Sequence, residues 1–118
     1  KCLIMSTQAK ISLRADINGY WLLTVEVGDK EATSAIGGTN ANKLIAMGLS
    51  FTSKVHKGGM ENAGSHSAKV KLKPKERLLH SDHDLHIKLI TGADATITME
   101  QTMSDKLRAM GVEVEHAD

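Results

Sequence analysis

Two stretches of this chain resemble each other, and this internal match constrains the fold more than any other feature of the sequence. Residues 21–53 align without a gap on residues 84–116 and share nine identities, including Ala46-Met47-Gly48 with Ala109-Met110-Gly111. Unrelated stretches of ordinary composition would share about two. We therefore expect a duplicated unit that serves as the scaffold of the fold, because self-similarity at a fixed spacing is typical of repeated structural units.

A second interpretation of the match needs no duplication. Short helices that lead into strands tend towards Lys-Leu-x-Ala-x-Gly, because burial and helix termination favour these residues. In addition, the alternation of apolar residues places Val25 and Ile87 out of phase in the ungapped alignment, a difference that a bulge would repair. The sequence leaves both interpretations open.

The first unit, residues 11–55, has the pattern strand, strand, helix, strand. Asn18-Gly19 lies between two segments of alternating apolar residues, which is the strongest short-range signal for a β-hairpin. A helical pattern then begins near residue 39 and ends at Gly48, with Thr39 or Asn40 as the expected N-cap. An alternating segment at residues 49–55 predicts the next strand.

The second unit, residues 84–116, repeats this order. Two alternating segments flank a turn at residues 91–94, and a helix capped by Thr102 or Ser104 ends at Gly111. Val112–Glu115 predicts a final strand. A glycine-rich loop at residues 56–68 joins the two units.

These patterns predict an α+β fold, organised as a single domain over residues 1–118. Its two strand-strand-helix-strand units are expected to form one mixed sheet or a small barrel. Short units of this kind leave edge strands, and pairing between edges would bury them. We therefore expect a homodimer or a larger homo-oligomer.

The composition narrows the setting in which such a fold would work. Cys2 is the only cysteine, so the chain can form no intrachain disulfide, which is typical of a reducing compartment. The apolar runs are too short to span a bilayer. We expect a cytoplasmic protein with no membrane partner.

Basic residues are concentrated in one part of the chain although the formal net charge is only +1. Residues 69–75 alternate lysine with apolar residues, so an extended strand would present its lysines on one face. Such a row could follow a phosphate backbone. The candidate nucleic-acid or anion-binding residues are Lys54, Lys57, Lys69, Lys71, Lys73, Lys75 and Arg77.

Two structural roles compete with anion binding for this lysine row. Lysines on an edge strand protect a sheet against aggregation, and Pro74 also suits an edge. Alternatively, Glu113 and Glu115 alternate on the predicted final strand and could pair with the lysines across strands.

Histidines and aspartates form a second cluster just before the second unit. Imidazole and carboxylate groups are ligands for divalent transition metals, and in an extended chain Asp82, Asp84 and His86 would share a face. His66 or His116 could complete the coordination. The competing interpretation is a solvated connection without metal, which would still give sensitivity to pH. The candidate metal ligands are His80, Asp82, His83, Asp84 and His86.

Three functions follow from these features. The first is a non-enzymatic module that binds an acidic partner, nucleic acid above all, through the lysine strand. The second is a small metal-dependent enzyme or metal-sensing domain, and the third is a structural or protein-binding subunit of an oligomer. The sequence has no Gly-x-Ser-x-Gly elbow, and no catalytic residue is assigned.

Overall fold

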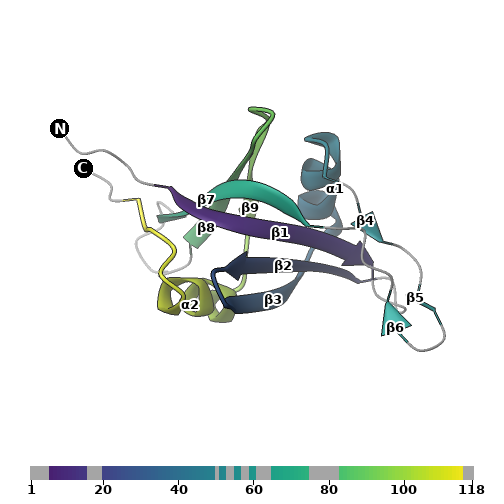
Figure 1. Ribbon diagram of the computed structural model, residues 1–118, viewed down its shortest axis with the longest axis horizontal. Helices are drawn as coiled ribbons and strands as arrows, with labels where there is room; N and C mark the ends of the chain where they lie inside the picture. Colours follow the sequence, from purple (N-terminus) through teal and green to yellow (C-terminus); the bar gives the residue numbers. More distant parts are fainter. Residues whose placement is uncertain are drawn as a thin grey trace.

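The structure, a computed structural model, is a small mixed fold made mostly of strands. It describes residues 6–15, 20–49, 51–52, 55–56, 59–60, 65–74 and 83–115. One curled sheet of six antiparallel strands forms a half-barrel, accompanied by two helices (Figure 1). The elements are β1 (Thr7–Ala15), β2 (Trp21–Val27), β3 (Lys30–Ile36), α1 (Gly38–Ala46), β4 (Phe51–Thr52), β5 (Val55–His56), β6 (Gly59–Met60), β7 (His66–Pro74), β8 (His83–Leu89), β9 (Asp94–Thr98) and α2 (Gln101–Ala109).

The strands of the half-barrel follow the order β3-β2-β1-β7-β8-β9. The short strand β4 adds to β1 in parallel, while β5 and β6 form a separate two-stranded sheet. The predicted α+β class is therefore correct, and β4 makes the sheet mixed. Because β3 and β9 lie at the two ends of the order, the sheet is a half-barrel and not the closed barrel that was the alternative.

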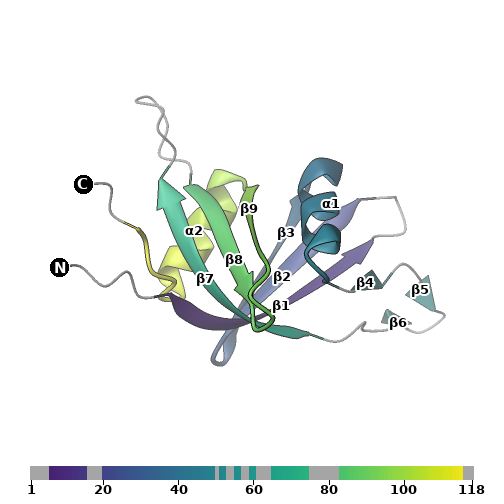
Figure 2. The same ribbon diagram turned by 90° about the horizontal axis from the view of Figure 1, so that it is seen from above.

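The two helices lie at different ends of the curled sheet (Figure 2), and both bury apolar side chains in its core. Helix α1 contacts β9, and α2 contacts β3 and β8, so each helix reaches the far half of the sheet. Leu44 of α1 and Leu107 of α2 are fully buried together with Ile11, Val70 and Ile87 from the strands. Burial of this apolar surface holds the helices against the half-barrel.

The pairing of β1 with β2 confirms the predicted hairpin, but its register differs from that of a two-residue turn. Ile11 lies opposite Val25, and both side chains are fully buried. A two-residue Asn18-Gly19 turn would instead place Ile11 opposite Glu26. The buried face therefore sets the register, since a slip by one residue moves every side chain to the other face. Residues 16–19 lie outside the described part of the chain.

Strand β3 was not predicted. It follows β2 through the two-residue connection Gly28-Asp29, because Val27 pairs with Lys30. Its sequence, Lys-Glu-Ala-Thr-Ser-Ala-Ile, contains few β-branched residues and therefore has a weak strand signal. The strand is nonetheless anchored by buried Ala32 and Ile36.

The helix starts were predicted incorrectly and the helix ends correctly. Gly37 and Glu100 occupy the N-cap positions, and neither makes a side-chain capping bond. At the C-terminal ends, Gly48 and Gly111 have φ values of 107° and 96°. The N–H groups of the next residues, Leu49 and Val112, donate to carbonyls in the last turn, so both helices end in a Schellman motif.

Two other predicted boundaries need correction. Strand β7 begins at His66, so the last residues of the expected 56–68 loop belong to a strand. The predicted final strand is reduced to a single parallel bridge between Val114 and Leu72. Two backbone hydrogen bonds support this bridge, from Leu72 N–H to the Glu113 carbonyl (2.8 Å) and from Glu115 N–H to the Leu72 carbonyl (2.7 Å).

The two halves of the sheet have matching registers. They meet where Ala9 of β1 lies opposite Ala68 of β7. The Ile11–Val25 pair of the first half has its counterpart in Val70–Ile87 of the second. The turn between β8 and β9 is one residue longer than its counterpart between β2 and β3. In it, Leu89 N–H donates to the Ala93 carbonyl, which leaves three residues in the turn. This extra residue accounts for the phase difference between the apolar residues of β2 and β8.

Candidate anion-binding face

The predicted alternation of β7 is confirmed. Val70 and Leu72 are fully buried, while Lys69, Lys71 and Lys73 point to the opposite, outward face of the sheet. Because β7 lies at the centre of the sheet between β1 and β8, the edge-strand interpretation of its lysines is wrong. Lys54, Lys57, Lys75 and Arg77, the other predicted anion-binding residues, lie outside the described residues.

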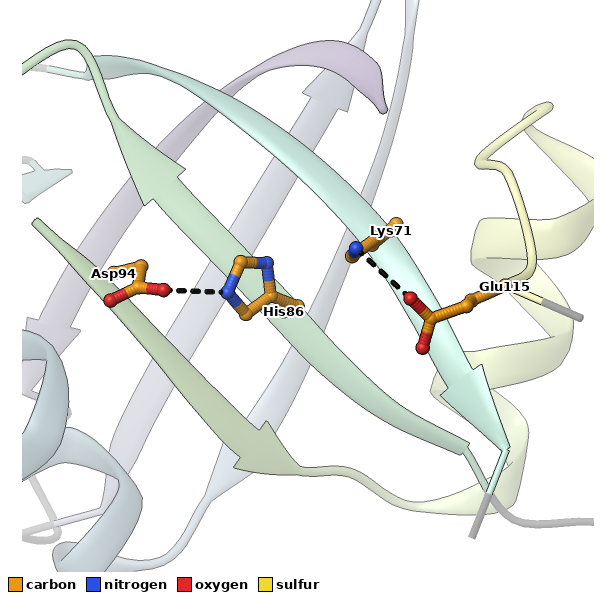
Figure 3. Close-up of polar contacts among 4 residues, drawn as sticks. All are labelled: Lys71, His86, Asp94 and Glu115. Atoms are coloured by element: carbon orange, nitrogen blue, oxygen red, sulfur yellow. Dashed lines mark hydrogen bonds and ion pairs between the residues drawn. The ribbon is translucent and has the colours of Figure 1, made fainter. Parts of the chain in front are cut away.

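Lys71 is paired with Glu115, as the second structural interpretation required. Its Nζ donates to Glu115 Oε1 at 3.1 Å, and the two side chains are 16% and 25% exposed (Figure 3). The hydrogen bond from Lys71 lowers the pKa of the Glu115 carboxyl, and the charges of Lys71, Lys73 and His86 lower it further, against a smaller opposing effect of burial. Lys71 is therefore neutralised within the protein.

The register places acidic residues beside most other lysines of the outward face. On this face β1 contributes Lys10 and β8 contributes Lys88, which extend the lysine row of β7 sideways. The lysines with an acidic cross-strand neighbour are Lys10 with Glu26, Lys73 with Asp84, and Lys88 with Asp94.

Lys69 is the exception. Its cross-strand neighbours are Gln8 on β1 and Lys88 on β8, and both lysines are exposed. Like charges directly opposite each other on neighbouring strands destabilise a sheet. The Lys69–Lys88 pair is thus the part of the outward face where an anion would relieve repulsion.

A hollow of about 300 Å³ lies beside this pair. We call it the Lys69–Lys88 hollow. Its walls come from β1, β7, β8 and the turn that follows β8, and its lining residues are Gln8, Ala68, Lys69, Lys88, Leu89, Ile90 and Gly92. Ile90 is 81% exposed, so an apolar side chain stands at the rim of a basic site.

Of the predicted metal ligands, the structure describes His83, Asp84 and His86, and these three do not form a metal site. His83 is buried on the apolar face of β8, whereas Asp84 and His86 lie on the outward face, as alternation requires. His80, Asp82 and His116 fall outside the described residues. Within the part of the chain that is described, no group of three or more histidine, cysteine or acidic side chains could hold a metal ion.

His86 is instead engaged with an aspartate of the next strand. Its Nε2 lies 3.0 Å from Asp94 Oδ2, and His86 itself lies opposite Lys71 on the neighbouring strand (Figure 3). The hydrogen bond with His86 is the main cause that lowers the pKa of the Asp94 carboxyl, and the charges of His86, Lys88 and Lys73 add to it. Asp94 is therefore an anion beside Lys88.

Three residues of the site, Gln8, Lys10 and Lys88, were missed in the sequence. Lys10 and Lys88 each lie between apolar neighbours, and Gln8 lies two residues before Lys10, so alternation predicts an outward position for all three. Nothing in the sequence indicated that β1 and β8 would flank β7, however, and the site depends on that adjacency.

No protein-family model matches this chain, and neither curated proteins nor solved structures gave a significant match. Among the described residues, no helix is both long and apolar enough to cross a bilayer.

Proposed function

We propose that this protein is a non-enzymatic binding module that takes an acidic partner, nucleic acid, on the outward face of its sheet. The observation that carries the proposal is the exposed Lys69–Lys88 pair, in which two ammonium groups face each other across neighbouring strands. A phosphate backbone supplies negative charge without demanding sequence-specific contacts.

The pairing of the other lysines limits how many phosphates the face can contact. Lys71 is held by Glu115, and Lys10, Lys73 and Lys88 have acidic cross-strand neighbours. Asp94, the neighbour of Lys88, is also bonded to His86. Because Lys69, Lys88 and Lys10 are exposed whereas Lys73 is half-buried, we expect the contacts to centre on Lys69 and Lys88, with Lys10 as a third. This is a smaller footprint than the seven basic residues that the sequence indicated.

The salt dependence of binding to a mixed single-stranded oligonucleotide tests this proposal. Three phosphate contacts give a slope of about −2 for log affinity against log salt, whereas seven contacts would give about −5. A slope near −5 would contradict the small footprint. No binding at low salt would contradict the function itself.

Charge-reversal variants then locate the contacts. The double substitution Lys69→Glu and Lys88→Glu should abolish binding. As a control with the same change in net charge, Lys30→Glu with Lys106→Glu alters two exposed lysines that lie away from the pair. Equal losses in both variants would mean that only the net charge matters, and the outward face would lose its special role.

We also propose that the two halves of the chain derive from one duplicated unit. The matched registers around the Ala9–Ala68 pair and the same termination of α1 and α2 support this origin. A duplication predicts that relatives of this protein share residues between the halves at these positions. Identity no higher than chance in such relatives would contradict it.

A further inference from the structure

A second hollow, of about 350 Å³, lies on the other side of the point where the two halves of the sheet meet. We call it the Lys10–Glu26 hollow. It is lined by Gln8, Ala9, Lys10, Glu26, Gly28 and Ser67. By the register of the halves, Lys10 takes the place of Lys69, Glu26 that of Lys88, and Gly28 that of Ile90.

The two hollows therefore have the same frame but different chemistry. Across the strands, the first row is Gln8, Lys69, Lys88, Asp94, and the second is Ser67, Lys10, Glu26, Glu31. The second row pairs its lysine with a glutamate and has no apolar residue in the place of Ile90. The first row places Lys69 opposite Lys88, and the exposed Ile90 also lines the first hollow.

We propose that the Lys69–Lys88 hollow binds the terminal phosphate monoester of a nucleic-acid strand, with the terminal nucleoside against Ile90. This inference rests on the proposed nucleic-acid function and names the part of the strand that this site takes.

The charge of the ligand follows from the two lysines. A phosphate monoester carries a charge of about −1.5 to −2 at pH 7, whereas a diester within a chain carries one negative charge. The two facing ammonium groups attract the monoester more strongly than the diester, although Asp94 beside Lys88 offsets part of their charge. The side-chain amide of Gln8, opposite Lys69 on β1, supplies a further hydrogen-bond donor in the lining of the hollow.

The size and the rim of the hollow indicate the rest of the ligand. A volume of about 300 Å³ is at the lower limit of small-molecule sites, so the hollow suits one terminal group and not a length of chain. Ile90, at 81% exposure, offers an apolar surface next to the charges. A base or sugar that covers it removes apolar area from water.

Two oligonucleotides of identical sequence, one with a 5′-phosphate and one with a 5′-hydroxyl, test the inference by titration at low salt. We expect the phosphorylated strand to bind at least about 10-fold more tightly. Equal affinity would overturn the terminal-phosphate site and leave the general nucleic-acid function standing. If neither strand binds, both proposals fail.

The second hollow supplies matched variants. Lys88→Glu copies the Lys10–Glu26 arrangement, which this protein already tolerates, so the variant should fold and lose the preference for the phosphorylated strand. Ile90→Gly should reduce that preference only in part.

The reciprocal change, Glu26→Lys, should create a second site for the phosphorylated strand, seen as a stoichiometry that rises from one towards two. If Lys88→Glu still binds the phosphorylated strand more tightly than the 5′-hydroxyl strand, the proposal is wrong. This holds even if the unaltered protein shows the expected preference.

Discussion

At the scale of single residues, the buried hydroxyl of Ser104 bears on the stability of the protein. Ser104 of α2 is fully buried, and its Oγ finds no hydrogen-bond partner among the residues that the structure describes. The corresponding position of α1 is Ala41, which is also fully buried. A buried polar group without a partner costs about 1–3 kcal/mol.

We predict that Ser104→Ala raises the free energy of unfolding by about 1 kcal/mol, because it removes the unsatisfied hydroxyl and gives the helix its most favourable residue. Chemical denaturation followed by circular dichroism measures the change. Ala41→Ser is the matched control and should destabilise the protein. A loss of stability in Ser104→Ala would mean that the hydroxyl has a partner in solution.

The Lys71–Glu115 pair predicts a dependence of stability on acid. The pKa of Glu115 is lower in the folded protein than its ordinary value of 4.5, so the carboxylate contributes stability above that value and loses it as the pH falls through the folded pKa. Lys71→Met removes the hydrogen bond. The stability difference between the unaltered protein and this variant should therefore shrink below about pH 4.5.

Denaturation at a series of pH values between 3 and 7 measures this difference, and the titration of Glu115 by NMR gives its pKa directly. The contribution is small because both side chains retain contact with solvent. A difference that stays constant over the whole range would show that Lys71 stabilises the sheet by packing alone.

At the scale of elements, helix ends and alternating strands were predicted well because their signals are local. Gly48 and Gly111 end their helices as expected, since few residues other than glycine adopt a positive φ. The helix starts were predicted too late in the chain. Polar residues in the first turn of each helix were interpreted as N-caps, whereas the N-cap positions are Gly37 and Glu100. Strand β3 was missed because an alanine- and serine-rich segment forms a strand only when its partner β2 is present.

Gly48→Ala should destabilise the protein by roughly 1–2 kcal/mol, because an alanine with φ near 107° brings its Cβ against its own backbone. No other atom lies within 4 Å of the added Cβ among the residues described, so the cost is one of backbone conformation alone. Thermal denaturation measures the loss, and Gly37→Ala, at a position of ordinary negative φ, is the control. Equal effects of the two substitutions would rule out this explanation.

Helix α1 also closes one edge of the sheet, which bears on the expected homodimer. Asn40 Nδ2 donates to the Thr98 carbonyl at 3.0 Å, and Thr98 N–H donates to Asn40 Oδ1 at 3.4 Å. Lys43 Nζ donates to the Thr96 carbonyl at 3.4 Å. These bonds occupy backbone groups that an edge strand would otherwise offer to another chain, so β9 is protected against pairing. Of the two terminal strands of the half-barrel, β9 is therefore the less suited to self-association through its edge.

At the scale of the whole molecule, the site depends on contacts between distant segments. The lysine alternation in β7 was predictable from seven consecutive residues. The Lys69–Lys88 pair was not, because it requires the registers of β1, β7 and β8, and such non-local pairings are set by burial of the shared apolar face. The register of β1 and β2 places Glu26, not a second lysine, beside Lys10. The bridge between Leu72 and Val114 brings Glu115 to Lys71.

Helix α1 contacts β9 of the second half, and α2 contacts β3 of the first half. We therefore predict that the two halves unfold together. Leu107 of α2 is fully buried, and α2 contacts β3, which pairs with β2 and its Trp21. Leu107→Ala should cost about 2–5 kcal/mol and shift the transition reported by Trp21 fluorescence as much as that reported by circular dichroism. Arg108→Ala, an exposed change in the same turn, should shift neither by more than about 0.5 kcal/mol. An unchanged fluorescence transition in Leu107→Ala would show that the first half folds independently, because the damaged helix would then contribute nothing to the strands around Trp21.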